Sequence, residues 1–573
     1  MRKFLLVFLM LMMLLLLLPF SAQAREISAL YVGDASTEVP TGGKLPVDAI
    51  RWRKTSDGGY DLYLPSYLDC SALRVYMKGA DSFEANGVTV NSGDITDVFV
   101  PGTKVTVKNG NNRYTVSVYQ SDSVGTVYLR TASGNISNLS ESKRNKEGGY
   151  VKIVDEKGEI SCDEELEYVR LRGNYSFQVP KKSFHLKLTT KRKVLGMDKS
   201  KTWLLLANYC DNSQIRDAIA FDMAQAAGMT FSIDYRFVDM YLNNSYYGTF
   251  MLTEKVQVGK NRVNVFDLEE ATEALNKKPL VSYGQKGKNK VQNGTYKYYN
   301  IPNDPEDITG GYLIQIELSK RYVGSMCGFV TECGQCVLLK SPEYASQAQV
   351  EYISGIVQSL ENAISAPDGI DPVTGKHYTE IADMDSMVQK YLIEEITKNL
   401  DGNKTSFYLY KYPDSVSTKL YFGPVWDFDK SMGVHSDSKY AGITNVPEGL
   451  MVGEKPGAEK AAEEYFFFPK LYAHDDFRAE VKKQYKETFR PMLEVLLGMR
   501  EPSAATGNLR SLQDYEEMLT GSTTMNFLLR PTLGKHNNDF PVRTGNDYHE
   551  NIEYIRNFLT ERMAYLDALW LDE

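Results

Sequence analysis

Cysteine is scarce in this chain, with six residues among 573, at positions 70, 162, 210, 327, 333 and 336. Cys333 and Cys336 form a C-x-x-C pair near Cys327, but no histidine lies close in sequence to complete a metal site. The flanking segments resemble strands and not a βαβ unit, which argues against a thioredoxin-like motif. We expect a hairpin turn here, carrying either thiols or one small-loop disulfide.

Long apolar runs are absent beyond residue 18. The run Phe4 to Leu18 follows Arg2-Lys3 and precedes an A-x-A-like site that ends at Ala24. This pattern is typical of a secretory signal peptide over residues 1–24. An uncleaved membrane anchor is the alternative, although the run is short for a membrane span. We expect a soluble mature chain with no transmembrane segment, secreted to an extracytoplasmic location in the cell envelope or at the surface.

A basic excess is missing too, because 65 Lys and Arg face 74 Asp and Glu, for a net charge of −9. This balance argues against a general nucleic-acid binder. A chain of 573 residues is too long for one compact core, so two or three domains are predicted. The 38 tyrosines fit a protein rich in strands.

Residues 25–124 alternate in short runs separated by Gly, Asn and Ser turns. The runs are Tyr60 to Leu64, Leu73 to Met77, Lys104 to Lys108 and Tyr114 to Tyr119, with a hairpin signal at Asn109 to Asn112. This pattern predicts a small all-β sandwich of immunoglobulin-like type. It carries no titratable cluster that indicates chemistry. We expect an accessory module, with contact to a glycan or the cell surface as one role.

The character of the sequence changes after about residue 124. Arg170 and Arg172 fall on one face of a strand, and a Gly-Asn-Tyr-Ser loop follows. In the next strand, Ser183 to Leu188, His185 and Lys187 share one face. Basic residues beside such a turn can neutralise phosphate. A solvated strand face explains the same alternation equally well.

The middle of the chain alternates between helix and strand patterns. Asp211 or Ser213 can cap a helix from Ile215 to Ala226. Further patterns predict a hairpin of Phe237 to Leu242 with Tyr246 to Leu252 leading to Glu254, a polar flexible surface insertion at 267–307, a strand at Gly311 to Leu318, and a helix at Ser346 to Ile364.

Two acidic motifs follow one another near the C-terminal third. A helix beginning near Asp385 runs into Asp401-Gly-Asn403, and a hairpin then leads to Asp427 and Asp429. This DxD pair would share a face of extended chain and suit Mg²⁺ when phosphate completes the shell. The alternative is that one aspartate caps the next segment and the other is solvated. The order of helix, loop carboxylate, hairpin and metal-type carboxylate is that of a protein-kinase catalytic lobe.

From about residue 125 to 573 the chain resembles the CotH kinase family, atypical protein kinases named for spore coat protein H. A terminal amphipathic helix, Tyr554 to Trp570 with Arg562, also fits. The motifs that carry the resemblance are Arg172-Gly-Asn-Tyr-Ser176, Lys181-Lys-Ser-Phe184, Trp203 to Asp211 with Ile215-Arg-Asp217, Tyr247 to Glu254, Asn399-Leu-Asp401 and Pro424 to Asp429.

The resemblance implies an α+β fold with a two-lobed, atypical protein-kinase-like domain and no Walker A or G-x-G-x-x-G loop. By the same analogy, Asp401 is the base that accepts a hydroxyl proton. Lys187 or Lys182 holds the nucleotide phosphates, with Lys187 preferred because it alternates with an apolar strand face. Arg172 belongs to the same nucleotide site, and Glu254 lies near the hinge or pairs with a lysine.

The resemblance also assigns metal ligands. Asp427 takes the part of the DFG aspartate toward Mg²⁺ or Mn²⁺, with Asp429 as helper. Ser406 stands where related kinases carry a metal-binding Asn, and Asn403 can reach in its place.

The sequence therefore predicts a secreted kinase that transfers the γ-phosphoryl group of ATP to Ser or Thr of secreted or surface proteins. The second hypothesis is a non-catalytic envelope protein whose kinase-like domain binds a nucleotide, glycan or protein partner, since exported proteins meet little ATP. Ser406 favours this second hypothesis. A two-carboxylate glycosidase is a third class, which no feature of the sequence prefers.

Overall fold

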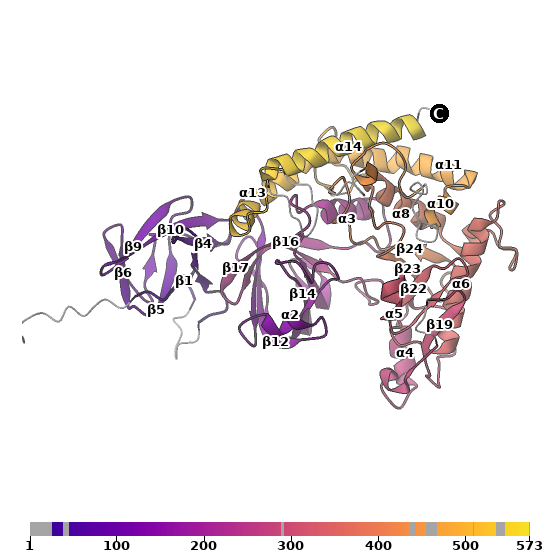
Figure 1. Cartoon of the computed structure of the whole chain (residues 1–573), viewed down its shortest axis with the longest axis horizontal. Helices are drawn as coiled ribbons and strands as arrows, with labels where there is room; N and C mark the ends of the chain where they lie inside the picture. The colour runs from indigo at the N-terminus through magenta and orange to yellow at the C-terminus, as the bar shows by residue number, and fades with distance from the viewer. Residues whose placement is uncertain are drawn as a thin grey trace, which may run out of the picture.

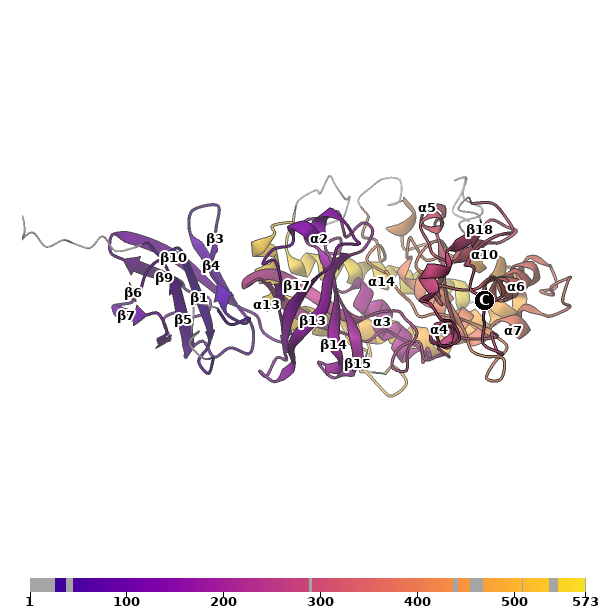
Figure 2. The same cartoon turned by 90° about the horizontal axis from the view of Figure 1, so that it is seen from below.

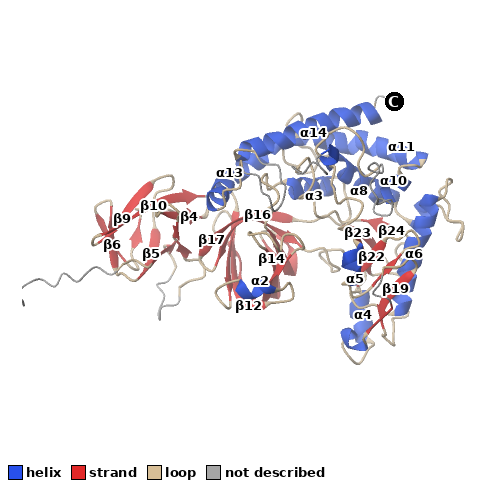
Figure 3. Cartoon of the chain, viewed as in Figure 1, coloured by secondary structure: helices blue, strands red, loops and turns tan. Residues whose placement is uncertain are grey.

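The computed structural model describes residues 26–37, 45–287, 291–435, 442–453, 467–507, 509–534 and 545–571. The fold is mixed α+β, with most strands in the first half and the long helices toward the C-terminus (Figure 3). The expected signal peptide at 1–24 lies outside the described residues. No helix within the described ranges is long and apolar enough to cross a membrane.

The N-terminal part forms two sheets that enclose one core. Their strand orders are β2-β1-β5-β8 and β3-β4-β10-β9-β6-β7, and β4 pairs with β10 in parallel. The strands predicted from the sequence are confirmed as β4, β5, β9 and β10, whereas the immunoglobulin-like type stays a prediction. The strands are β1 (Ala29–Asp34), β2 (Ile50–Arg51), β3 (Arg53–Lys54), β4 (Tyr60–Leu64), β5 (Leu73–Lys78), β6 (Ser82–Ala85), β7 (Val88–Asn91), β8 (Ile95–Thr96), β9 (Lys104–Asn109) and β10 (Asn112–Gln120).

A closed barrel follows, in the order β11-β12-β13-β14-β15-β17-β16. It closes because β11 pairs in parallel with β16, more than a hundred residues away. Phe184, Leu186 and Leu188 point into its core, so His185 and Lys187 lie on the outer face. The strands are β11 (Gly125–Thr131), β12 (Glu147–Val154), β13 (Ile160–Arg172), β14 (Ser183–Val194), β15 (Met197–Leu206), β16 (Tyr235–Leu242) and β17 (Ser245–Glu254), with helix α2 (Ser137–Glu141) after β11.

The sandwich packs directly on the barrel. The rings of Tyr63 and Tyr246 stack with centroids 4.9 Å apart, and the Tyr241 hydroxyl donates to the Tyr63 carbonyl at 3.1 Å. Lys152 of the barrel forms an ion pair of 2.5 Å with Asp48. Figures 1 and 2 show the sandwich, the barrel and the helix-rich part in a row, bridged along one side by α13 (Leu512–Leu529) and α14 (Tyr548–Trp570).

The C-terminal part is built on a seven-stranded sheet of order β18-β19-β21-β22-β20-β23-β24. The segment 267–307 was predicted to be a flexible surface insertion, and this is wrong for its ordered elements. It contributes α4, in which Leu268 is fully buried, and strands β18 and β19, whose residues pair in the sheet. The strands are β18 (Gln285–Gly287), β19 (Thr295–Tyr299), β20 (Tyr312–Glu317), β21 (Gly328–Val330), β22 (Cys336–Ser341), β23 (Phe407–Lys411) and β24 (Leu420–Phe422).

Helices cover this sheet and join it to the barrel. The predicted helices after Ser213, Ser346 and Asp385 are confirmed as α3, α6 and α8. The expected C-x-x-C hairpin is confirmed as β21 and β22, and its cysteines are thiols. The remaining elements are α3 (Arg216–Ala226), α4 (Leu268–Ala274), η2 (Leu280–Tyr283), α5 (Ser319–Val323), α6 (Gln347–Ser365), α7 (Tyr378–Ile381), α8 (Met384–Thr397), α10 (Phe467–Leu471), α11 (Asp475–Gln484), η3 (Tyr485–Phe489) and α12 (Arg490–Leu496).

Candidate functional site

Asp401 lies in the loop after α8, in the position that the sequence predicts. The Asn399 side chain organises this loop, because its amide donates to Glu394 at 2.8 Å and its oxygen accepts from the Asp401 N–H at 3.2 Å. Glu394 is itself buried and paired with Lys390 at 2.8 Å. The Asp401 carboxylate accepts from Lys430 at 3.0 Å. A buried polar chain therefore fixes the backbone that presents this carboxylate.

Asp427 follows β24 in a left-handed backbone conformation, with φ of 75°. Ser406, also left-handed at φ of 56°, donates its hydroxyl to the Asp427 carboxylate at 2.8 Å. Asn403 donates its amide to the Val452 carbonyl at 2.9 Å, and its side-chain oxygen is buried with no hydrogen-bond partner. Ser406 therefore contacts Asp427 of the DxD pair, whereas the Asn403 amide is bonded to another loop. The metal-binding roles of both residues stay predictions.

Asp217 of α3 joins the two DxD aspartates. Its carboxylate accepts from the Phe428 N–H at 2.7 Å, between Asp427 and Asp429. Burial, together with Asp427 and Asp211, raises the pKa of Asp217 to about 7, against the Phe428 hydrogen bond. Burial, Asp427 and Asp217 raise the pKa of Asp429 well above its ordinary value. Three mutually repelling carboxyl groups are the environment that a bound cation would relieve.

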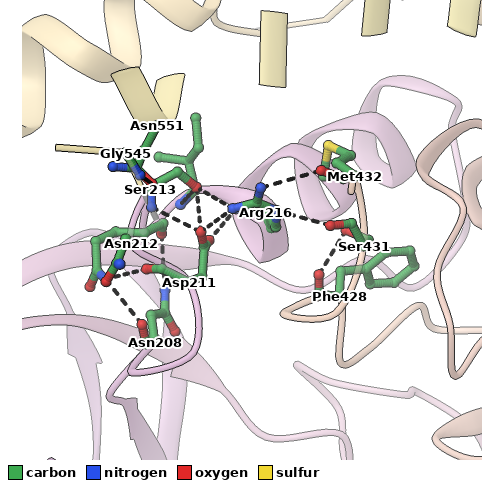
Figure 4. A network of polar contacts seen from close by, with 12 residues as sticks. Asn208, Asp211, Asn212, Ser213, Arg216, Phe428, Ser431, Met432, Gly545 and Asn551 are labelled. Carbon is green, nitrogen blue, oxygen red and sulfur yellow. Dashed lines mark hydrogen bonds and ion pairs between the residues drawn. The ribbon is translucent and has the colours of Figure 1, made fainter. Parts of the chain in front are cut away.

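Arg216 fastens the DxD loop to the barrel side of the molecule (Figure 4). Its guanidinium pairs with Asp211 and donates to the carbonyls of Ser431 at 2.9 Å and Met432 at 3.2 Å. Asp211 in turn accepts from the Ser213 N–H at 2.9 Å, so the loop before α3 is closed on itself. Arg216 therefore holds the segment after β15 and the loop that carries Asp427 and Asp429 together as one unit.

The outer face of β13 and β14 is basic, as the alternation predicts. Arg170 and His185 are cross-strand partners, and Arg170 donates to His185 Nδ1 at 3.0 Å. Burial and the surrounding cations Lys255, Arg170 and Arg172 lower the pKa of His185 to about 2. The guanidinium of Arg172 stands 5.6 Å from the Trp426 ring, directly before Asp427. Burial lowers the pKa of Arg172, and Asp427 opposes that shift.

The two predicted phosphate-binding lysines are already engaged. Lys187 pairs with Glu167 at 2.9 Å on an exposed part of the strand face. Lys182 donates to the Phe177 carbonyl at 2.7 Å. Glu254 lies at the end of β17 and pairs with Arg262 at 2.5 Å, not with a lysine. Burial raises the pKa of Glu254 to about 7, opposed by Arg262.

Lys255, the residue after Glu254, was not singled out from the sequence. Burial, Lys340 and Arg170 lower its pKa to about 8, so it lies among the cations of the barrel face. Within the described residues Arg172, Lys255 and Lys340 form no ion pair. Strand alternation is the signal that could have found Lys255, because it places this side chain opposite to Glu254.

Arg172 and the carboxylates meet at one cavity of about 50 Å³. Arg172 and Ser183 line it from the barrel, and Asp217, Asp427 and Asp429 from the other side. Its volume admits an ion or a few waters. Within the described ranges no three acidic, His or Cys side chains converge closely enough to hold a metal ion unaided. The oxygen donors fit a hard divalent cation that completes its shell with phosphate and water.

Lys430 and Asp217 are further members of this site that sequence reasoning did not assign. Burial alone would lower the pKa of Lys430, but Asp401, Asp429 and Asp427 together raise it above its ordinary value. Lys430 follows the DxD pair directly, and this spacing is the signal that could have identified it. Asp217 contacts Phe428 across 211 positions, a separation that no local pattern encodes.

Known proteins give independent evidence on the family of this chain. One solved structure, of a candidate glycoside hydrolase from Bacteroides thetaiotaomicron, is 14% identical and aligns over 52% of this chain and 62% of its own, with a TM-score of 0.12. The chain thus spans about three fifths of that relative, and so low a score carries no argument. No curated protein matches. The family model for CotH kinase protein matches residues 169–566, more than half of the sequence, and the chain therefore belongs to the CotH kinase family.

Proposed function

We propose that this protein is a secreted phosphotransferase that moves the γ-phosphoryl group of ATP to Ser or Thr hydroxyls of secreted or surface proteins. Membership of the CotH family supports a kinase-like activity. The observation that carries the proposal is the cavity where Arg172 meets Asp217, Asp427 and Asp429. Cations beside clustered carboxylates are the two halves that a metal-bound polyphosphate requires.

The barrel face takes the role of the phosphate-binding lobe of an atypical protein kinase. Arg172 and Lys255 belong to this face, and Lys340 of β22 lies near Lys255. None of the three forms an ion pair among the described residues, so their charge is available to a polyphosphate. Arg170 adds a positive charge to the same face, and the neutral His185 ring orients it by accepting its hydrogen bond. We assign the phosphates to this set instead of Lys187 and Lys182, whose ammonium groups already have protein partners.

Asp401 acts as the base toward the acceptor hydroxyl. Its carboxylate is fixed by the Asn399 loop and by Lys430 at 3.0 Å. Lys430 interacts electrostatically with Asp401, Asp429 and Asp427, so its ammonium can compensate the negative charge that builds up during transfer. A proton taken from the hydroxyl passes to an Asp401 oxygen, which lies at hydrogen-bond distance from a cation that compensates the change.

Asp427 and Asp429 would hold Mg²⁺ or Mn²⁺, with Asp217 fixing their loop through the Phe428 N–H. The metal, when bound, neutralises phosphate charge and orients the transferred group. Ser406 keeps the Asp427 carboxylate in place with its hydroxyl. The cavity is too small for a whole nucleotide, so the base and ribose would extend beyond it along the cationic face.

The second candidate is a non-catalytic envelope protein that binds a nucleotide, glycan or protein partner. One observation favours it. Ser406 stands at the expected metal-binding position, and its hydroxyl already donates a hydrogen bond to Asp427. In either case we propose an extracytoplasmic location and a glycan or surface contact through residues 25–124.

The purified chain incubated with γ-labelled ATP, Mg²⁺ or Mn²⁺ and a general acceptor protein tests the proposal. We expect label on Ser or Thr, lowered about 10²- to 10⁴-fold by Asp401→Asn and by Asp427→Asn. Asp475→Asn is the matched control, because its side chain is 96% exposed and its ion pair is with Arg478 of the same helix, α11. No label, or equal label in Asp401→Asn, rejects the kinase in favour of the binding protein.

A further inference from the structure

A second cavity, of about 240 Å³, lies beside the site but is not part of it. It opens between the loop after α3, the first turn of α8, and the β23–β24 hairpin. Gly423 lines it, four residues before Asp427 in the chain. Four extended residues span at most about 14 Å, so the cavity neighbours the DxD loop.

Aromatic rings form one wall of this cavity. Tyr410 and Tyr421 are cross-strand partners whose rings stack at 5.3 Å, and Phe231 stands 4.8 Å from Tyr410 at 61°. Tyr412 packs at near right angles against both tyrosines and holds them in place. The result is a packed cluster of rings, of which Phe231, Tyr410 and Tyr421 border the space.

Two carboxylates, Asp383 and Asp385, line another wall of the cavity. Asp383 caps α8 by accepting from the Ser386 N–H at 2.9 Å, and Asp385 accepts from Gln484 at 3.0 Å. Each contact uses one oxygen, and no described donor takes the other. The described residues that line the cavity include no lysine, arginine or histidine. Lys483 of α11 acts on Asp385 electrostatically but is itself paired with Glu480, so the lining of the cavity supplies no cation to this wall.

We propose that this cavity binds an organic cation, an alkylammonium or guanidinium group. Aromatic rings attract such a cation through their quadrupoles, and carboxylates at the rim neutralise it. The volume suits a guanidinium or a trimethylammonium head with its first methylenes and is small for a drug-sized molecule. The group comes either from a free solute or from a basic side chain of a polypeptide, which share this chemistry.

Titration of the whole chain with N-acetyl-arginine amide and with tetramethylammonium, followed by calorimetry or ligand-observed NMR, tests the proposal. We expect dissociation constants near 1 mM for both cations, a typical value for a single charged group. N-acetyl-citrulline amide has the same shape without the charge and should bind at least about tenfold more weakly. Equal binding of arginine and citrulline derivatives overturns the proposal.

Substitutions at two positions, Tyr421 and Asp385, locate the cation. Tyr421→Leu removes a ring and should weaken binding about five- to thirtyfold, whereas Tyr421→Phe keeps the ring, loses only the 3.0 Å bond to Ser417, and should bind like the parent. Asp385→Asn removes an exposed charge without a change of shape and should weaken binding about threefold. Asp385→Asn keeps the test valid if Tyr421→Leu does not fold. Unchanged affinity in both Tyr421→Leu and Asp385→Asn rejects this cavity.

A decapeptide with one central arginine, compared with its citrulline version, identifies the source. Binding more than about threefold tighter than that of the capped amino acid assigns the cation to a polypeptide. Equal affinity assigns it to a free solute. Failure of phosphoryl transfer leaves this result intact, because the assay measures binding alone.

Discussion

The two sides of the candidate site are built by different means. The barrel presents its cations from regular strands, where Arg170 and Arg172 follow the period of two and Arg170 faces its cross-strand partner His185. The opposite side presents its carboxylates from loops, with left-handed backbone at Ser406 and Asp427. The difference teaches that charge on a sheet can be placed by alternation alone, whereas carboxylates in loops need a buried network to hold them.

Arg216 joins these two sides, and breaking it should have the largest effect. Arg216→Met leaves Asp211 buried and unpaired and releases the carbonyls of Ser431 and Met432, so we expect a loss of about 3–5 kcal/mol in the free energy of unfolding. Urea unfolding measures this loss. Arg478→Met, which breaks a solvent-exposed pair with Asp475, is the control and should leave stability nearly unchanged. Equal stability of the two variants contradicts the role of Arg216.

The cation side is sharpened by comparing two lysines. Lys255→Met should weaken binding of a non-hydrolysable ATP analogue about tenfold, because it removes an unpaired charge from the buried face. Lys187→Met should change the affinity less than about twofold, since Glu167 already neutralises that ammonium. Fluorescence or calorimetric titration measures both. A larger loss of affinity in Lys187→Met than in Lys255→Met would restore Lys187 as the phosphate-binding residue.

The same lysine makes the cation side sensitive to pH. Burial and nearby cations lower the pKa of Lys255 from 10.5 to about 8, so its ammonium loses a proton as pH rises through that value. Nucleotide affinity should therefore fall about three- to tenfold between pH 7 and pH 9. The folded state binds fewer protons than the unfolded chain between pH 8 and 10.5, so stability from this group rises over that window. Lys255→Arg should flatten the affinity profile, and a slope that persists in Lys255→Arg assigns the titration elsewhere.

The carboxylate side is sharpened at Ser406, with the smallest effect. Asn tolerates the left-handed conformation at φ of 56° and offers a stronger metal-binding oxygen, so Ser406→Asn should raise Mg²⁺ affinity about two- to threefold. Ser406→Ala removes the hydrogen bond to the Asp427 carboxylate and should lower Mg²⁺ affinity by a similar factor. Metal titration of transfer activity gives both constants. A lower Mg²⁺ affinity in Ser406→Asn would mean that serine is the better residue for metal binding at this position.

Much of this fold could be predicted from local pattern. The helix after Ser346, the helix into Asp401, and the hairpin of β23 and β24 all follow from spacing that acts over a few residues. The strands carrying Arg170 and His185 were predicted for the same reason. The segment 267–307 misled the prediction, since its polar composition masked the alternation of Tyr296 and Tyr298 with buried Lys297 and Tyr299.

What the sequence could not supply is set by contacts between distant residues. The barrel closes through β11 and β16, and the DxD loop depends on Asp217 and Arg216, more than 200 positions away. Lys187 was predicted on the correct face of its strand, but its partner Glu167 lies on the neighbouring strand. Alternation gives the direction of a side chain and not whether another group already neutralises it.

The central claim is that the cations and the DxD carboxylates act on one metal-bound nucleotide. Titration of a non-hydrolysable ATP analogue with Mg²⁺ and with EDTA, in the parent, Lys255→Met and Asp427→Asn, tests it most directly. We predict that Mg²⁺ tightens binding in the parent and in Lys255→Met, at a lower absolute affinity in the latter, and has no effect in Asp427→Asn. An undiminished Mg²⁺ effect in Asp427→Asn, or no nucleotide binding by the parent, would contradict the claim.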